Sequence, residues 1–396
     1  MSEGPLTGLV RSGPWEPDDE QRQLRATVRA VLERHAPPAP AVDDPPGEYD
    51  AELWRRLATE IGVAGLAVPE ELGGAGGSYL DCHLVLAELG RVVAATPYLA
   101  TLLATQALLL ADPGDPLVAW FAESARTAAL VPGLRARPEA DDAWRVSGVA
   151  ELVLDGARAD VLLAVTDDGL FHLEDRPGAP GLDREAATPM DRSLHLATVR
   201  CDDVPAERLG PLDAQARARL ADLGPIAVTA AQAGAAERCL ELTTAYVSQR
   251  VQFGRPIGSF QAVKHRLADL LVLVETATSA SWAAAAAWAA DAPDTPLLAD
   301  VAASWCAEAY RAVAAETVQL HGGIAITWEH DAHRHLKHAH ATAHLFGTPE
   351  SHRARLATHL PPPGGDAPPQ AVIMHDRNAP TARGEPSRPS RRSYRA

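Results

Sequence analysis

Histidines crowd one segment near the carboxyl end of the chain, and imidazole is the commonest metal ligand among side chains. The segment Gln319–Phe346 reads "QLHGGIAITWEHDAHRHLKHAHATAHLF". His340 and His344 are four residues apart, which places them on one face of a helix. The spacing lacks the glutamate of an HExxH zinc motif, and no third ligand is evident, so no metal site is predicted. We interpret the histidines as a solvated, partly cationic helix face; they are His330, His333, His335, His338, His340, His344 and His352.

The composition is that of an ordinary chain with a large apolar core. A chain of 396 residues is too long for one simple hydrophobic core, so roughly two to four packed units are expected. The formal net charge of −16 argues against nucleic acid, because phosphate binding needs a basic face. The four cysteines form no CxxC pair, so neither a disulfide scaffold nor a zinc site is indicated, and a cytoplasmic location is expected. No signal pattern and no apolar run of about 18 residues is present, so no membrane partner is expected.

Hydrophobic periodicity divides the chain into three blocks between two terminal segments. Apolar residues recur every three to four positions from 18 to 115, as in "DDEQRQLRATVRAVLERHA", which predicts helices. Short β-type runs such as "WRVSGVAELVLDG" fill residues 116–211 and predict a small β domain. Helical spacing returns over 212–360. This order predicts an α+β fold with segregated layers, residues 1–17 being an N-terminal extension and 361–396, rich in Pro, Arg and Ser, a disordered tail.

Three motifs, in order along the chain, resemble those of the acyl-CoA dehydrogenase family. Residues 62–81, "GVAGLAVPEELGGAGGSYLD", resemble the family's N-terminal helical domain. Residues 250–270, "RVQFGRPIGSFQAVKHRLADL", are similar to its Arg-x-Gln-Phe-Gly signature. Residues 318–339, "VQLHGGIAITWEHDAHRHLKHA", are similar to its Gly-Gly signature, with Ala325 where the family has a further glycine.

The resemblance covers about residues 18–360 and implies a fold and a reaction. The fold is an N-terminal helical domain, a middle β-barrel and a C-terminal four-helix bundle, usually assembled as a tetramer. The family binds FAD and desaturates acyl-CoA thioesters between Cα and Cβ.

The same resemblance implies which residues contact the flavin nucleotide. An arginine holds a pyrophosphate through a bidentate fork, and paired glycines let a backbone approach a ligand closely. In the family, some of these positions reach across a dimer interface to the ADP half of the neighbouring subunit's FAD; they match Arg250, Phe253, Gln319 and Gly323. The full predicted cofactor-binding set is Arg250, Gln252, Phe253, Gln261, Gln319, Gly322, Gly323 and Thr348.

A general base is missing from both positions that the family uses. Abstracting the proton on Cα needs a base within hydrogen-bond reach. Most of the family places a Glu directly before Gly-Thr, where this chain has Phe346, and a minority places it on an earlier helix, at about Gly224. Gln232 on that helix is neutral. Substitute carboxylates stay open, and they are Asp222, Glu237 and Glu350.

The middle block lacks the family's flavin-facing groups. The stretch "AALVPGLRARPEADDAWRVSG" lacks the family's Thr-Glu-Pro-x-x-Gly-Ser-Asp loop. Leu152, Val153 and Leu154 stand where the family has Trp-Ile-Thr/Ser. Leucine packs on a flavin ring but offers no hydrogen bond, so a reduced flavin should be bound more weakly.

Three functions stay open. The first is a catalytically incomplete subunit of a heteromeric, FAD-dependent acyl-CoA dehydrogenase; "TWEHDAH" and "FGTPESHR" resemble actinobacterial-type members that form α2β2 heterotetramers, including steroid side-chain enzymes. Its FAD would be shared with, or held mainly by, a second subunit; the substrate would be an acyl thioester and the electron acceptor an electron-transfer flavoprotein. The second is a complete homomeric enzyme with a relocated base. The third is a flavin-free structural or interaction protein of the same fold.

Overall fold

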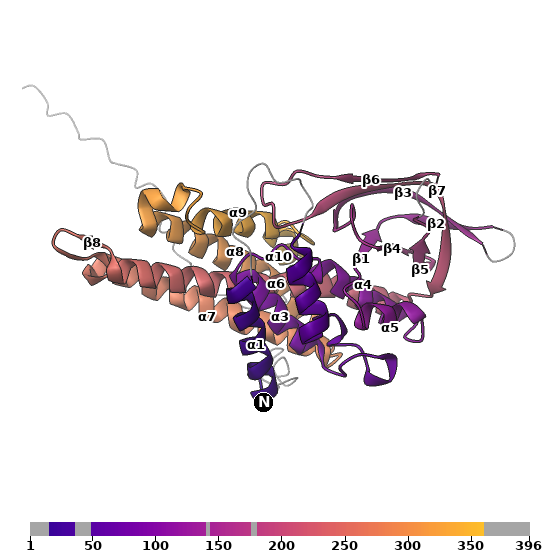
Figure 1. The fold of residues 1–396 in the computed structure, drawn as a ribbon, viewed down its shortest axis with the longest axis horizontal. Helices are drawn as coiled ribbons and strands as arrows, with labels where there is room; N and C mark the ends of the chain where they lie inside the picture. Colours follow the sequence, from indigo (N-terminus) through magenta and orange to yellow (C-terminus); the bar gives the residue numbers. More distant parts are fainter. Residues whose placement is uncertain (1–15, 36–48, 140–142, 176–179, 360–396) are drawn as a thin grey trace, which may run out of the picture. The chain divides into compact units, whose positions relative to one another are not determined.

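The computed structural model describes residues 16–35, 49–139, 143–175 and 180–359. Most of the predicted N-terminal extension and the whole predicted tail lie outside these residues. Helices come first, then a sheet, then helices again, which confirms the α+β fold class (Figure 1). The N-terminal helices are α1 (Asp19–His35), α2 (Ala51–Arg55), α3 (Tyr79–Arg91), α4 (Tyr98–Ala111) and α5 (Pro116–Ala122). The last of them, α5, falls within the span predicted as β structure.

A curled sheet follows the first helices. Its strands are β1 (Ala128–Pro132), β2 (Arg135–Pro138), β3 (Trp144–Leu154), β4 (Val161–Thr166), β5 (Gly169–Leu173), β6 (Leu182–Ala186) and β7 (Leu196–Gly210). The order is β1-β4-β5-β7-β3-β2, with β6 beside β7. Strands β1 and β4 are parallel, and the other pairs are antiparallel. Val131, Val146, Leu162, Phe171 and Val199 fill its inner face.

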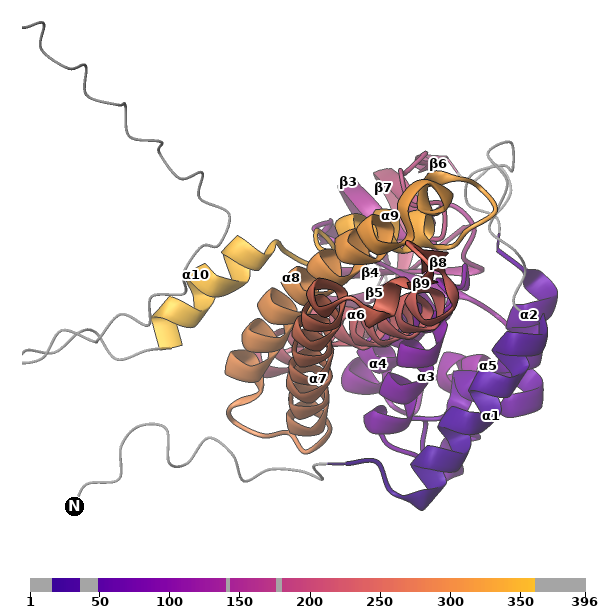
Figure 2. The same cartoon turned by 90° about the vertical axis from the view of Figure 1, so that its left-hand side faces the viewer.

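Three long helices form the second helical region. They are α6 (Ala214–Gln249), α7 (Gln261–Ala289) and α8 (Thr295–His321), and they run side by side in both views (Figures 1 and 2). Asp213 caps the start of α6: its Oδ1 accepts a hydrogen bond from the Ala216 backbone N–H at 2.8 Å. Strands β8 (Val251–Gln252) and β9 (Arg255–Pro256) form a hairpin between α6 and α7, and α9 (Ala332–Thr342) and α10 (Pro349–His359) close the region.

Two glycines allow α3 and α6 to touch through their backbones. A Cβ on Gly90 would lie 2.1 Å from the Ala231 carbonyl oxygen, and one on Gly234 would lie 2.0 Å from the Ala87 carbonyl oxygen. Real side chains do not tolerate such distances, so the crossing requires glycine on both helices. The N-terminal helices and the long helices therefore share one core, which includes Trp54, Leu84, Ile226, Ala285 and Trp288.

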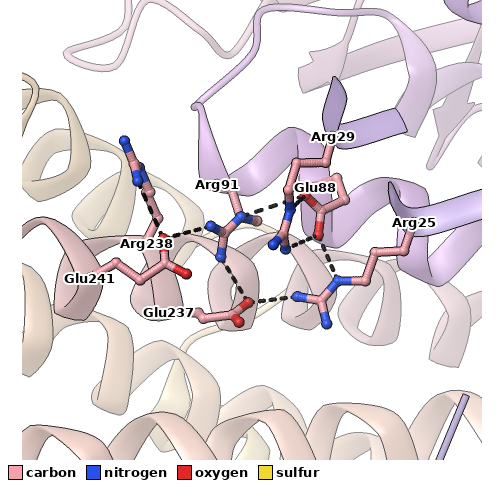
Figure 3. Close-up of polar contacts among 7 residues, drawn as sticks. All are labelled: Arg25, Arg29, Glu88, Arg91, Glu237, Arg238 and Glu241. Carbon is pink, nitrogen blue, oxygen red and sulfur yellow. Dashed lines mark hydrogen bonds and ion pairs between the residues drawn. The ribbon is translucent and has the colours of Figure 1, made fainter. Parts of the chain in front are cut away.

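Buried charges join α1, α3 and α6 (Figure 3). The Glu88 side chain is 1 % exposed, and its Oε1 accepts hydrogen bonds from Arg25 at 2.6 Å and Arg29 at 2.7 Å. The hydrogen bond to Glu88 raises the pKa of Arg29. Arg91 extends the network to α6, where it pairs with Glu237 at 2.9 Å and Glu241 at 2.6 Å.

Helix α7 contains an apolar window longer than the sequence analysis expected. By length and composition alone, this one helix among the described residues could cross a membrane. Half of that window is buried inside the structure, where α7 packs against α6 and α8. Buried core helices meet the same criterion, so the finding is weak support for a membrane span.

Candidate functional site

An apolar pocket of about 390 Å³ lies between the sheet and the helices. Its wall is formed by α4, α6, strands β1, β3 and β4, and the loop that follows α9. Most of the wall is apolar; within the described ranges, its titratable side chains are Glu151, Arg217 and His344. The Arg217 guanidinium donates hydrogen bonds to the Asp167 and Leu212 carbonyl oxygens, at 3.1 and 2.6 Å.

Phe346 and Gly224 meet in the wall of this pocket. A Cβ built on Gly224 would lie 2.7 Å from Cδ1 of the Phe346 ring, so the ring occupies the space that a side chain on α6 would need. Phe346 has a φ of +59°, in the left-handed region, and it precedes Gly347 at φ +120°. The two positions predicted for a base therefore lie side by side in the pocket wall. One holds a phenyl ring and the other has no side chain, so neither offers a proton acceptor.

The substitute carboxylates do not line the pocket. Glu237 belongs to the ion-pair network of Arg25 and Arg91 (Figure 3). Asp222 is half-buried on α6, outside the pocket wall. Glu350 is exposed at the start of α10, where a backbone hydrogen bond and one from Thr348 hold its pKa below the ordinary value. Gln232, the neutral residue considered on the same helix, is buried, and its side-chain amide donates a hydrogen bond to the Thr342 hydroxyl at 3.3 Å.

Glu151 is a carboxylate in the pocket that sequence reasoning missed. The register of β3 against β7 shifts between Ala150 and Val153, and Leu152 has a φ of +57°. A bulge of this kind breaks the alternation of faces along a strand, because one extra residue is inserted. Consecutive residues from Glu151 to Leu154 consequently line the same pocket. The only signal in the sequence is the position of Glu151 directly before the stretch that corresponds to the family's flavin-facing residues.

Most of the predicted flavin contacts gather at the far end of the long helices. Arg250 directly follows the last residue of α6, the β8–β9 hairpin carries Gln252 and Phe253, and Gln261 begins α7. The end of α8 joins them, because the Tyr246 hydroxyl donates to the His321 carbonyl at 3.2 Å and the two rings stack 4.4 Å apart. Gln319, Gly322 and Gly323 lie at this end of α8. Thr348 is apart from them, two residues beyond Phe346.

This helix end is open to solvent. Phe253 is 91 % exposed at the tip of its hairpin, and Ile326 and Trp328 are 75 % and 61 % exposed. No hydrogen bond or ion pair engages the Arg250 guanidinium within the described part of the chain. A Cβ on Gly322 or Gly323 would meet nothing within 4 Å, so the space above this turn is free for a group from outside. An anionic ligand or another subunit fits here, since a free arginine and apolar surface adjoin.

The pocket and this helix end are far apart in one subunit. Gly224 and Arg250 are separated by 26 positions along α6, which at 1.5 Å per residue is roughly 39 Å. Figure 1 shows the β8–β9 hairpin at the opposite end of α6 from the sheet. One flavin nucleotide does not span that distance, so it could not contact both regions of one chain.

The prediction of a solvated histidine face is wrong for His335 and His338 on α9 and for His352 on α10. His335 is buried and pairs through Nδ1 with the Tyr310 hydroxyl at 3.1 Å, and burial lowers its pKa to about 3. His338 is held by Asp191 at 2.7 Å, and His352 by Asp300 at 2.8 Å. Ala332, His335, Ala339 and Thr342 recur at three- to four-residue spacing and form the buried stripe of α9. Histidine and alanine thus take the place of the leucines that mark most buried stripes.

No metal centre arises from these histidines within residues 16–35, 49–139, 143–175 and 180–359. The side chains there contain no group of three or more His, Cys, Asp or Glu that could hold a metal ion. His344 is exposed in the wall of the pocket, while His338 faces a separate, smaller cavity.

Two family models match the chain. The acyl-CoA dehydrogenase N-terminal domain matches residues 18–114, and the acyl-CoA dehydrogenase C-terminal domain matches residues 216–360. Acyl-CoA dehydrogenase IpdE2 of Mycobacterium tuberculosis is 39 % identical over 348 residues, covering 87 % of this chain and 98 % of that protein. The IpdE2 of Mycolicibacterium smegmatis is 40 % identical over 262 residues, covering 65 % of this chain and 74 % of that protein.

Solved structures with the same fold include one described as a complex and one described as a steroid ACAD. A chain of the ChsE4–ChsE5 complex from Mycobacterium tuberculosis superposes with a TM-score of 0.79 at 28 % identity, covering 88 % of this chain and 100 % of that one. A chain of a variant of the Tcur3481–Tcur3483 steroid ACAD gives a TM-score of 0.77 at 31 % identity, covering 86 % and 97 %.

Proposed function

The chain belongs to the acyl-CoA dehydrogenase family, whose members are flavin-dependent oxidoreductases, and from this we propose that it is the catalytically incomplete subunit of a heteromeric enzyme. The observation that carries the proposal is the contact between Phe346 and Gly224. These positions correspond to the two places where the family keeps its general base, and neither accepts a proton here. The base that removes the Cα proton of the acyl thioester would then come from a second subunit.

The residues of this chain fit the nucleotide half of FAD better than its ring half. Arg250 offers a free bidentate fork for a phosphate, and the turn at Gly322–Gly323 leaves open space beside it. The pocket wall, by contrast, presents Leu152 and Val153 where the family has a tryptophan and a hydrogen-bonding residue. In the proposed complex, Arg250, Phe253 and Gly323 bind and orient the FAD that the second subunit holds. Bound FAD supplies the acceptor for the hydride that leaves Cβ.

The comparisons support the choice of partner and substrate class. One neighbour is a complex of two differently named chains, ChsE4–ChsE5, and another is called a steroid ACAD. We propose a second acyl-CoA dehydrogenase subunit as the partner and an acyl-CoA thioester from steroid or fatty acid degradation as the substrate. An electron-transfer flavoprotein would reoxidise the flavin, and the cytoplasm would be the location.

The test is flavin content and native mass, with and without a partner. The chain is purified alone and after co-expression with family members that keep a Glu before Gly-Thr. We expect a colourless protein that shows no turnover by itself and gains FAD, activity and mass in one pairing. Stoichiometric FAD with turnover from this chain alone would overturn the proposal.

A complete homomeric enzyme is the second candidate, and one observation favours it. Glu151 is a carboxylate in the pocket wall, in the same cavity as Phe346. If Glu151 were the base, Glu151→Gln would lower turnover by about a hundredfold or more, the scale of general-base catalysis. Glu174→Gln, on a residue outside that wall, is the matched control. An active chain that Glu151→Gln leaves unchanged would show that Glu151 is not the base, and absence of turnover from the chain alone would remove this candidate.

A further inference from the structure

Helix α6 contains a proline where it forms the wall of the apolar pocket. Pro225 is the only proline inside this helix, which continues without interruption from Ala214 to Gln249. Proline has no backbone N–H, and its ring crowds the carbonyl group four residues earlier in a helix. That carbonyl belongs to Ala221. It therefore lacks the hydrogen-bond donor that the next turn of an α-helix normally supplies, and the proline ring displaces it outward.

The Ala221 carbonyl belongs to the part of α6 that faces the pocket. Arg217, Leu220, Ala221 and Gly224 line the pocket, and they recur at the three- and four-residue spacing of one helix face. Ala221 is exposed, whereas Pro225 is buried behind the wall and does not line it. A helix carbonyl points along the axis toward the next turn, which here is the wall segment that ends at Gly224. A ligand in the pocket reaches this carbonyl directly, because Ala221 itself forms part of the wall.

No side chain in the described part of the chain donates a hydrogen bond to this carbonyl. Arg217, the arginine of the same wall, uses its Nη1 for the carbonyl oxygens of Asp167 and Leu212, at 3.1 and 2.6 Å. Phe346, which rests against Gly224, has no donor. The wall thus carries an unsatisfied acceptor three residues, or roughly 4.5 Å along the helix axis, from the contact between Phe346 and Gly224.

This acceptor decides which polar group a ligand should carry. A carbonyl oxygen accepts and never donates, so it pairs with a hydroxyl and repels a carboxylate or ketone oxygen. Glu151, the exposed carboxylate of the same wall, disfavours an anionic ligand as well. An ammonium group would lose its hydration against a largely apolar wall that also contains Arg217 and His344. A neutral hydroxyl on an apolar body satisfies all of these conditions.

We propose that the chain binds an apolar molecule with one hydroxyl group, its body in the pocket beside Phe346 and its hydroxyl donating to the Ala221 carbonyl. The proline in α6 creates the site, because it frees the acceptor without disturbing the rest of the helix. The site needs no flavin and no second subunit, so it goes beyond the proposed function and does not depend on it.

The experiment compares 4-cyclohexylphenol with its methyl ether, 4-cyclohexylanisole, by calorimetric titration of the purified full-length chain. The two probes share their ring skeleton, but only the phenol donates a hydrogen bond. We expect the phenol to bind about three- to tenfold more tightly, the effect of one hydrogen bond. Equal affinities would overturn the proposal, and so would the absence of binding by both probes.

Pro225→Ala tests the origin of that preference. Alanine supplies the N–H that α6 lacks, so the helix itself would take up the Ala221 carbonyl, and the two probes should then bind equally. The affinity of the anisole, which does not use the carbonyl, should stay the same and shows that the wall is intact. Glu151→Gln is the matched control, because it changes the other acceptor of the wall and should keep the preference. A preference that survives in Pro225→Ala, or that Glu151→Gln removes, would contradict the proposed site.

A carbonyl label gives a second readout that leaves Pro225 unchanged. In a chain with ¹³C-carbonyl alanine and ¹⁵N-labelled aspartate, the bonded pair Ala221–Asp222 gives a signal that Asp222→Asn assigns by its loss. This carbonyl resonance should shift with the phenol and not with the anisole; an unchanged resonance would overturn the placement of the hydroxyl. Because nothing here measures turnover, a failure of the heteromer proposal would leave this result untouched, and the reverse also holds.

Discussion

At the scale of single residues, the contact between Phe346 and Gly224 shapes the wall of the apolar pocket. Phe346 fills the space beside α6 because Gly224 has no side chain, and these are the two positions predicted to correspond to the family's carboxylate. The loop that presents Phe346 is held in an unusual conformation, with positive φ at Phe346 and at Gly347. The effect of a substitution at one of these residues should therefore depend on which residue stands at the other position.

The effect of Gly224→Ala on the free energy of unfolding should change sign when Phe346 is also replaced. In the native chain the new Cβ would lie 2.7 Å from the ring, and we expect a loss of about 1–2 kcal/mol in the free energy of unfolding, typical of overpacking. In a Phe346→Ala background the clash is gone, and the helix preference of alanine should give a gain of up to about 1 kcal/mol. Urea unfolding of the native chain, the two single variants and the double variant measures the coupling; the same effect of Gly224→Ala in both backgrounds would contradict the contact.

The buried histidines should make the fold sensitive to acid. Burial lowers the pKa of His335, and of His83, to about 3, from an ordinary value of 6.5. Above pH 6.5 both states hold these rings neutral, so the rings leave stability unchanged. As pH falls from 6.5 toward 3, the unfolded chain takes up protons that the folded chain does not, and each ring removes about 1.4 kcal/mol per pH unit.

The check is urea unfolding at pH 7 and pH 5. His335→Gln should lose about 2 kcal/mol less than the native chain over that interval, since one titrating ring is gone and about 1.5 units lie below its unfolded pKa. His344→Gln, which replaces an exposed ring, should follow the native chain. Identical losses in His335→Gln and the native chain would show that His335 is not buried and neutral.

At the scale of elements, the position of α1 depends on a charge network rather than on apolar contacts alone. Glu88 on α3 is 1 % exposed and receives two arginines from α1, while Arg91 carries the network on to α6 (Figure 3). Such a buried charge is tolerated only while its partners remain, because an unpaired ion in a dry interior loses its hydration without compensation.

Glu88→Gln should consequently be strongly destabilising. It leaves the α1 arginines facing a neutral amide, and we expect a loss of about 3–5 kcal/mol in the free energy of unfolding, the range for breaking a buried pair. Glu52→Gln is the matched control, because Glu52 pairs with arginines on an exposed face and should change stability little. A small effect at Glu88 would mean that α1 is held by its apolar side alone.

At the scale of the whole molecule, the intact motifs and the altered pocket lie at opposite ends of α6. In the proposed complex, the roughly 39 Å between them would allow one chain to keep residues for a neighbour's cofactor without those for its own chemistry. The side chains of Phe253 and Arg250, at the end of α6 away from the sheet, are exposed and so contribute little to the packing of this chain. Their retention is understandable if a second subunit covers them.

Arg250→Lys should separate binding from folding. It keeps the charge but loses the bidentate fork, so we expect FAD in the complex to bind about tenfold to a hundredfold more weakly. The free energy of unfolding of the chain alone should not change. Arg255→Lys is the control on the same hairpin, because Arg255 lies over the Phe260 ring at 4.2 Å. Unchanged FAD affinity in Arg250→Lys would remove Arg250 from the site.

The sequence by itself determined the order of helical and strand blocks, the family motifs and the absence of a carboxylate before Gly347. These are properties of local periodicity and residue chemistry, which need no knowledge of packing. Only the tertiary structure placed the Phe346 ring over Gly224, brought Glu151 into the pocket through a bulge, and buried His335 and His338. Such contacts join residues distant in the chain, and packing decides them, because whether a polar side chain is buried depends on the partner that another element brings to it.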